Sequence, residues 1–371
     1  MLENRINRVT IRNYRSLKDV TVELDDLTVL VGANASGKSN FLDALKFVRD
    51  ALTTNLSNAV KIRGGIQKIL YSGFSEITIA IALGLGDIEG EYDFTLQGIG
   101  SNFVVKQENC SIGEEYFHVQ NGVLHSSNIL REGQIHIKED VLVLPLFSAI
   151  SGITLYKKIV NLANFLLNMS FYNVLPNQIL FPEELSSSYP LAEDIKNLSS
   201  VLNQNILTRA SEANEINYSL AAIIPDIQKN NAILVEQFGN HLLTKLHHTN
   251  GWFDLTQESN GTLRTLAIMV ALYQSPALPL MAIEEPELMI HPRALPVLCD
   301  EISEAAIRGQ IIITTHSPDI IARFPPESLR IVEMVDGATQ IGKLTEYQRQ
   351  VINDQIFNGG DLLRIEGLKR E

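Results

Sequence analysis

The sequence predicts an α/β fold in which a β-rich first part and an α/β last part are separated by a mostly helical insertion. Three changes of pattern along the 371 residues predict this arrangement. Residues 1–150 contain alternating, strand-like runs, residues 151–248 show mostly helical spacing of apolar residues, and residues 249–371 combine helices with short buried strands. We therefore expect one α/β fold that is interrupted by an insertion over residues 151–248.

The first part is expected to begin with strands and one helix. Apolar and polar residues alternate between residues 6 and 24, whereas residues 28–31 are continuously apolar, as in a strand that is buried on both faces. Residues 41–48 have the spacing of a helix. Alternating runs at residues 77–83, 92–96 and 102–106, separated by Gly-rich breaks, predict an antiparallel β region.

Helical spacing follows from about residue 155. Ile159, Leu162 and Leu166 recur at helical intervals, and residues 190–247 have a similar texture with Asn- and Ser-rich breaks. No heptad pattern holds for three repeats, so a long coiled coil is not expected. In the last part we expect helices over residues 263–272 and 292–306, and short buried strands over residues 278–283 and 311–315.

The composition is that of an ordinary globular protein, with 45% apolar and 20% charged residues. A formal net charge of −13 argues against a protein that is wrapped in nucleic acid, although it leaves room for one local basic groove. Cys110 and Cys299 are too few and too far apart for a disulfide framework. The N-terminus lacks an apolar signal core, and no apolar run approaches the ~18 residues of a membrane span. We therefore expect a cytoplasmic protein.

Residues 32–39 read GANASGKS and carry the most specific motif of the chain. They fit G-x-x-x-x-G-K-[ST], the phosphate-binding P-loop, and they lie between a strand-like and a helix-like run, as that motif requires. Lys38 is expected to reach the β- and γ-phosphates, and the Ser39 hydroxyl to ligate Mg²⁺. The chain is thus predicted to be a P-loop NTPase that holds its nucleotide with Gly32, Asn34, Ser36, Gly37, Lys38, Ser39 and Asn40.

Two acidic residues end an expected strand in the last part. Glu284 and Glu285 follow an apolar run, and a strand end presents side chains at the carboxyl edge of a parallel sheet, where phosphates bind. Glu284 is expected to hold Mg²⁺ through water, and Glu285 to orient and deprotonate the attacking water. His316 ends the next expected strand, where it can donate a hydrogen bond to the γ-phosphate. Solvated loop acids and an ordinary surface histidine are the alternatives.

A further anion site is expected where residues 258–264 open a helix. Ser259 and Gly261 lie at the N-terminus of this helix, and the partial positive charge there favours an anion. Ser259 or Thr262 can also serve simply as the N-cap of the helix, and the two roles are compatible.

These motifs, in this order, resemble the ABC-type ATPases of the SMC/RecF/OLD class. More closely, the chain resembles the short stand-alone ABC ATPases, often labelled AAA, of bacterial antiphage and abortive-infection operons. The resemblance covers essentially the whole chain. It is carried by the runs at residues 11–17, 38–40, 64–65, 168–172, 259–264, 283–287, 291–292 and 314–318.

The resemblance implies an ABC-ATPase head that binds ATP and Mg²⁺ and works as a homodimer. In that family the signature, which Ser259 and Gly261 match here, closes on the γ-phosphate bound by the opposite subunit. Two ATP molecules are thereby sandwiched between two heads. Glu284 takes the place of the usual aspartate, Glu285 that of the catalytic base, and His316 that of the switch histidine.

The same resemblance assigns a few neighbouring residues. Arg12 and Arg15 lie where related heads place basic residues near the nucleotide, and Glu287 and His291 fall in the region of the D-loop. Related ATPases often assemble beyond dimers, and no residue of this chain fixes that number.

The sequence departs from the family pattern at the Q-loop. The glutamine that contacts Mg²⁺ and water should fall near residues 143–148, which read VLPLFS. Gln67 and Gln134 are weak candidates to replace it. The departure bears on the rate of hydrolysis more than on ATP binding, so we expect a slow ATPase. About 55 residues follow His316, too few for the C-terminal nuclease of the OLD relatives.

Three functional hypotheses follow. The first is an ATP-dependent dimeric switch that controls a separately encoded nuclease or toxin in antiphage defence. The second is a RecF-like clamp in DNA repair, and the third is an inactive nucleotide-binding scaffold. The clamp needs a basic strip, for which the candidates are Arg5, Arg8, Arg12, Arg15, Lys18 and the pair Lys157 and Lys158, although such residues are more often a solvated face.

Overall fold

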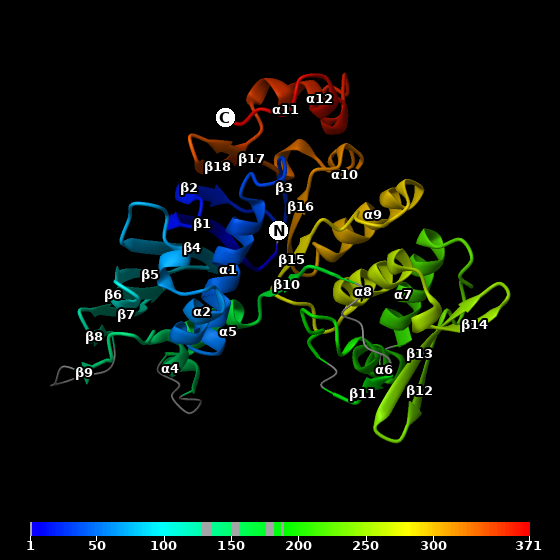
Figure 1. The fold of residues 1–371 in the computed structure, drawn as a ribbon, viewed down its shortest axis with the longest axis horizontal. Helices are drawn as coiled ribbons and strands as arrows, with labels where there is room; N and C mark the ends of the chain where they lie inside the picture. Colours follow the sequence, from blue (N-terminus) through cyan, green and yellow to red (C-terminus); the bar gives the residue numbers. More distant parts are fainter. Residues whose placement is uncertain (1, 128–134, 150–155, 176–181, 187–188, 209) are drawn as a thin grey trace. The chain divides into compact units, whose positions relative to one another are not determined.

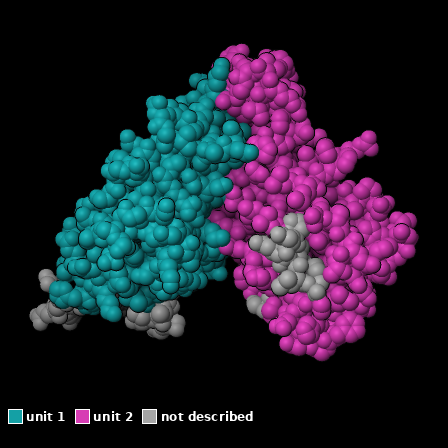
Figure 2. Space-filling view, in the orientation of Figure 1, with its two compact units in different colours: residues 1–169, 330–346, 369–371 teal, residues 170–329, 347–368 magenta. Residues whose placement is uncertain are grey.

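The computed structural model describes residues 2–127, 135–149, 156–175, 182–186, 189–208 and 210–371. The chain forms two compact units (Figures 1 and 2). Unit 1 comprises residues 1–169, 330–346 and 369–371, and unit 2 comprises residues 170–329 and 347–368. The predicted insertion over residues 151–248 is divided between these units, and the three-part division of the chain remains a prediction.

Unit 1 is built on an antiparallel sheet in the order β2-β1-β4-β5-β6-β7-β8-β9 (Figure 1). Strict alternation places one face of each central strand in the core: in β4, Ile77, Ile79, Ile81 and Leu83 are all at most 1% exposed. The strands are β1 (Asn4–Tyr14), β2 (Leu17–Glu23), β4 (Glu76–Leu85), β5 (Ile88–Ile99), β6 (Asn102–Ile112), β7 (Glu115–Gln120), β8 (Val123–Ser126) and β9 (Ile135–His136).

Helix α1 (Lys38–Thr53) packs its apolar face into the core of unit 1. Phe47 on this helix contacts the rings of Tyr14 in β1 and Phe94 in β5, with ring centroids 5.7 and 6.2 Å apart. Strand β3 (Leu27–Val31) leads into the P-loop and neighbours β17 (Leu329–Val335), which pairs with β18 (Ala338–Lys343). The other helices of this unit are α2 (Leu56–Ile62), α3 (Ile66–Ile69), α4 (Leu144–Ala149) and α5 (Lys157–Leu167).

One carboxylate lies at the centre of unit 1. Glu108 in β6 is fully buried and accepts hydrogen bonds from the Tyr92 hydroxyl and from the backbone N–H groups of Val143 and Leu144, at 2.5 to 3.0 Å. It thereby anchors the start of α4. Burial raises the pKa of Glu108 to about 7, and the two backbone hydrogen bonds only partly offset that effect.

This raised pKa predicts that the variant Glu108→Gln loses part of the pH dependence of stability. The folded state binds the proton of Glu108 more tightly than the unfolded state does, so the free energy of unfolding falls as the pH rises from about 4.5 to about 7. Denaturant unfolding at pH 4.5 and pH 7.5 measures how much the free energy of unfolding falls between the two pH values. This fall should be larger for the wild type than for Glu108→Gln, by on the order of 3 kcal/mol. Equal losses in both proteins would contradict the assignment.

Unit 2 contains a parallel run of strands, β10-β15-β16. These strands are almost wholly buried, as is typical of parallel strands. They are β10 (Ser170–Tyr172), β15 (Leu280–Glu284) and β16 (Gln310–Thr315). Helix α8 (Asn260–Tyr273) precedes β15, the 3₁₀ turn η4 (Pro292–Ala294) and α9 (Leu295–Ala305) connect β15 to β16, and α10 (Pro318–Ile321) follows β16.

A second, small sheet of unit 2 has the order β11-β13-β12, with β14 paired to β13. Its strands are β11 (Glu183–Glu184), β12 (Ile233–Phe238), β13 (His241–His248) and β14 (Gly251–Asp254). The remaining elements are α6 (Leu198–Thr208), α7 (Ala210–Ile223), η3 (Leu255–Gln257), η5 (Pro326–Ser328), α11 (Glu346–Asn353) and α12 (Gly359–Ile365). Within the described ranges, no helix is long and apolar enough to cross a membrane.

The helical prediction for residues 190–247 is correct for α6 and α7 and wrong for residues 233–248. Those residues form a hairpin in which Leu242, Thr244 and Leu246 are buried at alternate positions of β13. The period of two was obscured because the polar Thr244 lies on the buried face of β13 and the apolar Leu243 lies on the other face.

Candidate functional site

The P-loop begins α1 in unit 1 and has the geometry of a phosphate cradle. Gly37 is the N-cap of α1 at φ 110°, and a Cβ atom there would lie 2.0 Å from Oγ1 of Thr339. Only glycine fits this position. The Lys38 ammonium is 6% exposed and donates hydrogen bonds to the carbonyls of Gly32 at 2.7 Å and Ala33 at 3.0 Å. Lys38 therefore lies folded over the loop whose backbone N–H groups are expected to meet phosphate.

A chain of hydroxyl groups clamps the loop from the side of β18. The Thr339 hydroxyl donates to the carbonyl of Ser36 at 2.9 Å and lies 2.6 Å from the Ser16 hydroxyl. The side-chain amide of Asn40 donates to the same Ser16 oxygen at 2.7 Å. Asn40, predicted to contact nucleotide, thus has a structural partner. The hydroxyl of Ser36 is buried without a hydrogen-bond partner among the described residues, as expected of a group beside a phosphate subsite.

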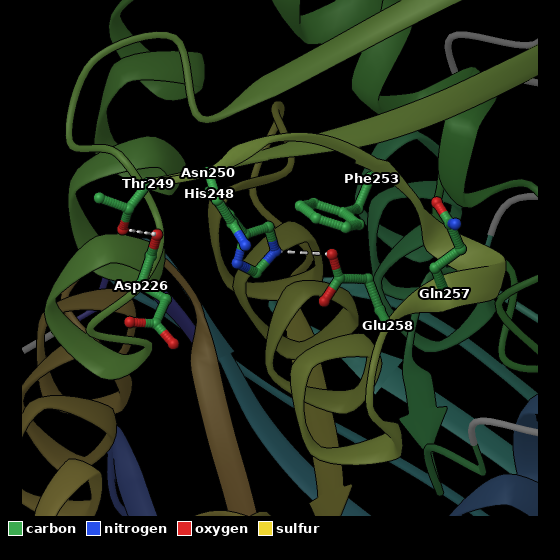
Figure 3. A pocket seen from close by; sticks show the side chains of 7 residues that line it. All are labelled: Asp226, His248, Thr249, Asn250, Phe253, Gln257 and Glu258. Atoms are coloured by element: carbon green, nitrogen blue, oxygen red, sulfur yellow. Dashed lines mark hydrogen bonds and ion pairs between the residues drawn. The ribbon is translucent and has the colours of Figure 1, made fainter.

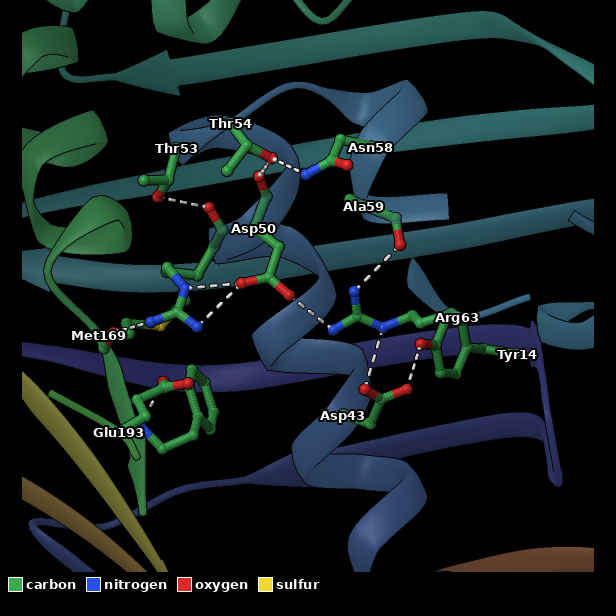
Figure 4. Close-up of polar contacts among 12 residues, drawn as sticks. Tyr14, Asp43, Asp50, Thr53, Thr54, Asn58, Ala59, Arg63, Met169 and Glu193 are labelled. Carbon is green, nitrogen blue, oxygen red and sulfur yellow. Dashed lines mark hydrogen bonds and ion pairs between the residues drawn. The ribbon is translucent and has the colours of Figure 1, made fainter. Parts of the chain in front are cut away.

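Two aspartates on α1 organise a second network, which the sequence did not reveal (Figure 4). The guanidinium of Arg63 is 5% exposed and donates to Asp43 from Nε and to Asp50 from Nη2, both at 2.9 Å. Asp43 also accepts the Tyr14 hydroxyl at 2.6 Å. Burial, reinforced by the Asp43 charge, raises the pKa of Tyr14, so this hydroxyl keeps its proton and remains a donor.

Arg15, predicted to lie near the nucleotide, is tied into this network. Its Nη2 lies 3.1 Å from Oδ2 of Asp43, and its backbone has φ 49°, a left-handed conformation that is uncommon for a non-glycine residue. Its backbone N–H donates to the carbonyl of Ile69 at 2.7 Å. Asp43 follows Lys38 by five positions on α1, so the same helix carries the phosphate-binding lysine and orients Arg15.

In unit 2, Glu284 and Glu285 lie at the carboxyl end of β15, as predicted. Glu285 has φ 44°, and its backbone N–H donates to the carbonyl of Thr314 at 3.0 Å and lies 3.2 Å from the Thr314 hydroxyl. Its carboxylate oxygen lies 3.4 Å from Nδ1 of His316. The two predicted catalytic side chains of this unit are therefore neighbours. A left-handed glutamate held by the adjacent strand is the kind of local strain found at functional sites.

Arg264 links the helix that Ser259 caps to the end of β15. This arginine of α8 is 1% exposed, and its Nη2 donates to the carbonyls of Glu284 at 3.0 Å and Glu285 at 2.8 Å. Its Nη1 donates to the carbonyl of Val174. Arg264 belongs to the motif at residues 259–264, but its role cannot be predicted from the sequence, because a hydrogen bond to a backbone carbonyl leaves no signature in the partner's side chain.

We expect Arg264→Met to lower kcat for ATP hydrolysis about tenfold or more while the Kd for ATP changes little. Hydrogen bonds from a charged donor are worth about 1.5–3 kcal/mol each, and their loss frees the backbone that aims Glu285. Arg264→Lys keeps the positive charge and part of the hydrogen bonding, so its kcat should lie between those of the wild type and Arg264→Met. Turnover and thermal unfolding of both variants check this: a fall in kcat that merely parallels the loss of folded protein would contradict a positioning role.

Ser259 and Gly261 lie in the first turn of α8. The Ser259 hydroxyl accepts the backbone N–H of Thr262 at 3.1 Å, so the N-cap role is present. A Cβ atom on Gly261 would lie 2.5 Å from the carbonyl oxygen of Met289, so glycine is needed for the close approach of the 288–290 backbone. The side chain of Met289 itself is 61% exposed. Gly261 thus has a packing reason within the chain besides its predicted role in the signature.

The residues predicted for the D-loop hold the segment after β15. Glu287 is partly buried and accepts a hydrogen bond from the Thr315 hydroxyl, which also accepts the backbone N–H of Ser317 at 3.0 Å. Burial raises the pKa of Glu287 despite that hydrogen bond. His291 is the N-cap of η4 and accepts the N–H of Arg293 at 3.2 Å.

The surroundings of the remaining candidates give little support to a DNA-binding strip or to a replacement for the Q-loop glutamine. Arg5 and Arg12 pair with Asp26 at 3.1 Å and Asp19 at 3.3 Å, so these cations are locally compensated. Residues 143–144 are held by Glu108, and no glutamine lies there. Gln67 donates to the carbonyl of Gly100 on the surface at 2.7 Å, whereas Gln134 lies outside the described residues.

The predicted site residues fall into two sets. Unit 1 contains the P-loop, Asn40 and Arg15, and unit 2 contains Glu284, Glu285, His316, Ser259 and Gly261. Within unit 2, Glu285 and His316 are in contact. The residues that the sequence analysis missed are Ser16, Asp43, Arg63 and Thr339 in unit 1 and Arg264 and Thr314 in unit 2. For Asp43 a signal existed, since Asp43 and Asp50 lie seven positions apart on one face of the P-loop helix.

Comparison with known proteins extends these observations. Residues 150–322 match the family model described as "AAA domain, putative AbiEii toxin, Type IV TA system", and residues 5–95 match the model of an AAA ATPase domain. Among curated proteins, the chain is similar to endonuclease GajA of Bacillus cereus (strain VD045), with 22% identity over 339 residues. The similarity covers 85% of this chain and 56% of GajA, so the chain spans about half the length of that relative.

Solved structures of SMC heads share the fold. A head bound to the C-winged helix domain of ScpA has 17% identity and a TM-score of 0.60, covering 93% of this chain and 99% of that chain. The head from Pyrococcus furiosus, with an extended coiled coil and bound to the C-terminal domain of ScpA, has 14% identity, a TM-score of 0.56 and coverages of 95% and 99%. The head from Thermotoga maritima has 12% identity, a TM-score of 0.50 and coverages of 92% and 99%. The predicted α/β fold with an antiparallel subdomain is confirmed.

Proposed function

The chain belongs to the SMC/RecF/OLD class of ABC-type ATPases, and we propose that it is a slow ATPase that dimerises around Mg-ATP and so controls an effector protein. The observation that carries the catalytic part is the pair formed by Glu285 and His316, 3.4 Å apart at the ends of β15 and β16. A carboxylate at a strand end, with its backbone fixed and a histidine beside it, is suited to orient and deprotonate water.

The donor sets of the two units fit ATP and Mg²⁺. The P-loop N–H groups and Lys38 would hold the β- and γ-phosphates, which neutralises their charge. The Ser39 hydroxyl and the Glu284 carboxylate are oxygen ligands of the type that Mg²⁺ prefers, since this ion is commonly bound by one or two protein groups together with phosphates and water. Bound Mg²⁺ would polarise the γ-phosphate, and His316 would donate a hydrogen bond to it.

Dimerisation is supported by the segment beside the start of α8. Met289 is 61% exposed and Leu288 is 38% exposed, although their backbone packs over Gly261. Apolar side chains exposed at this position suit a surface that is covered when a second head closes on it. In the proposed dimer, Ser259 and the N-terminus of α8 meet the γ-phosphate bound by the other subunit.

The proposed effector is a separately encoded nuclease or toxin of an antiphage system. The support is the similarity to endonuclease GajA and to the AbiEii-type family model. The chain spans about half of GajA, so the nuclease activity of that relative is not carried over with the similarity. In this proposal, the dimer that closes on ATP holds or aims the effector, and hydrolysis releases it.

Affinity capture with tagged Glu285→Gln protein from the native host in Mg-ATP tests this role. We expect a stoichiometric partner with nuclease or toxin features, which is absent from captures with Lys38→Ala or with Ser259→Arg. The arginine of the latter would fill the phosphate-facing helix start, so that ATP binds without closure. Equal recovery with all three variants would contradict ATP-dependent control.

A RecF-like clamp is the second candidate, and the SMC-head fold favours it. Against it, Arg5, Arg12 and Arg15 of the candidate basic strip are each paired with a carboxylate. A clamp would bind duplex DNA with an affinity that falls steeply with salt, because phosphate contacts release counterions. Absence of duplex DNA binding even at low salt would favour the effector-controlling role.

A further inference from the structure

A polar pocket of unit 2 lies directly before the helix that carries Ser259 (Figure 3). Its volume is about 510 Å³, and its lining includes Asp226, His248, Thr249, Phe253, Gln257 and Glu258. Asp226 lies in the loop after α7, and Gln257 and Glu258 lie in η3 and at its C-cap. The others come from the β13–β14 hairpin, with His248 at the end of β13, Thr249 in the turn and Phe253 in β14. A volume of this size is within the range of small-molecule sites, which is about 300–1,000 Å³.

The inner part of the pocket is a hydrogen-bonded histidine and glutamate against an aromatic ring. Nε2 of His248 lies 2.7 Å from Oε1 of Glu258, and the two side chains are 15% and 6% exposed. The ring of Phe253 stands edge-on to the imidazole, with centroids 5.3 Å apart. Figure 3 shows this group of three facing into the pocket. The pair thus forms part of the wall of the pocket.

The outer part carries a second carboxylate. The backbone of Asp226 is fixed, because its carbonyl accepts the N–H of Thr249 at 2.9 Å and the Thr249 hydroxyl at 3.2 Å. Its carboxylate, in contrast, has no hydrogen bond or ion pair among the described residues and is exposed at the rim. Among the described residues, no lysine or arginine lines the pocket. The lining therefore offers acceptors and negative charge around an aromatic face.

We propose that this pocket binds an organic cation, namely a guanidinium or primary ammonium group on a short alkyl chain. Asp226 supplies the charge, and Phe253 supplies both an apolar wall and a cation–π face. A metal ion fits less well, since the described residues contain no group of three or more His, Cys, Asp or Glu side chains that could hold one. An anion is disfavoured by the two carboxylates. The cation can belong to a free amine or to an arginine or lysine of a partner protein.

The pocket is located where a bound ligand can affect Ser259, a residue of the proposed ATPase site. Glu258 directly precedes Ser259, and its carboxylate is what ties the start of α8 to His248 in the hairpin. A cation that competes for Glu258 releases this tie and changes the position of the N-cap serine. This consequence rests on the proposed function, whereas binding of the cation does not.

Ligand-observed NMR with n-butylguanidinium at constant ionic strength tests the site, with n-butylurea as the uncharged isostere. We expect saturable binding of the cation with a Kd on the order of 1 mM and none of the urea. Asp226→Asn should weaken binding about fivefold, and Phe253→Leu about three- to tenfold. Asp300→Asn, a matched loss of charge at an exposed position of α9, should leave the Kd unchanged.

Equal binding of the urea, or an unchanged Kd in Asp226→Asn, would overturn the proposal. A capped Gly-Arg-Gly peptide distinguishes the sources of the cation: tighter binding of the peptide assigns the pocket to a partner's side chain, and exclusion of the peptide assigns it to a free amine. The titrations contain no nucleotide and can be repeated in Lys38→Ala protein, so their outcome is independent of whether the chain hydrolyses ATP. Turnover that is insensitive to saturating cation would overturn the link to Ser259.

Discussion

Lys38→Ala should lose ATP binding, with a Kd at least about 100-fold higher than that of the wild type. The lysine already lies over the P-loop, 2.7 and 3.0 Å from two of its carbonyls, so little rearrangement separates it from a phosphate on the same loop. Charge-assisted hydrogen bonds are worth about 1.5–3 kcal/mol, and about 2.7 kcal/mol corresponds to two orders of magnitude in Kd.

Isothermal titration calorimetry with Mg-ATP measures this effect. Lys61→Ala is the matched control, because Lys61 is an exposed lysine of α2 in the same unit and should bind as the wild type does. Retention of micromolar binding by Lys38→Ala, in protein that unfolds at the wild-type temperature, would mean that the P-loop is not the phosphate site.

Glu285→Gln should bind ATP normally and hydrolyse it about 10²- to 10⁴-fold more slowly, which is the usual contribution of a general base. The amide has nearly the same shape, so the φ 44° backbone and its hydrogen bond to Thr314 are retained. What is lost is the negative charge that accepts the proton of water. The amide oxygen can still accept a hydrogen bond from His316, so this neighbour can stay in place.

Steady-state turnover and nucleotide affinity separate these effects. Glu304→Gln, which removes an exposed glutamate of α9, should retain wild-type kcat and KM. A kcat of Glu285→Gln within a few fold of the wild-type value would remove Glu285 from the role of base. If the wild type itself shows no turnover while it binds ATP tightly, the chain is a nucleotide-binding scaffold.

The parts of the fold that sequence reasoning predicted are those with a local signal. Residues 27–39 combine a buried strand, a glycine-rich turn and a helix start in one short run. β15 and β16 are buried strands with a continuous apolar run, and chemically distinctive residues lie at or just after their ends. The β12–β13 hairpin was missed because β12 has no fully buried position and because Thr244 and Leu243 break the alternation of polar and apolar residues in β13.

The site was predicted less completely because its supports are distant in sequence. Thr339 holds Ser36 from 303 residues away, and Arg330 in β17 pairs with Asp25 at 2.6 Å across 305 residues. No local pattern connects such partners. Arg264 acts on backbone carbonyls, which every residue possesses, so its targets cannot be recognised from residue types. Gly261 was singled out for a role between subunits, and the structure adds the close approach of Met289 within the chain.

The central claim is that Mg-ATP closes two heads on each other, and sedimentation velocity of Glu285→Gln tests it most directly. With saturating Mg-ATP, this variant should sediment as a species of at least twice the mass of the 41.3 kDa chain, and with ADP it should be monomeric. Adding Ser259→Arg to the same chain should abolish the dimer while ATP remains bound. A Glu285→Gln protein that stays monomeric with ATP bound would contradict the ATP-sandwich account.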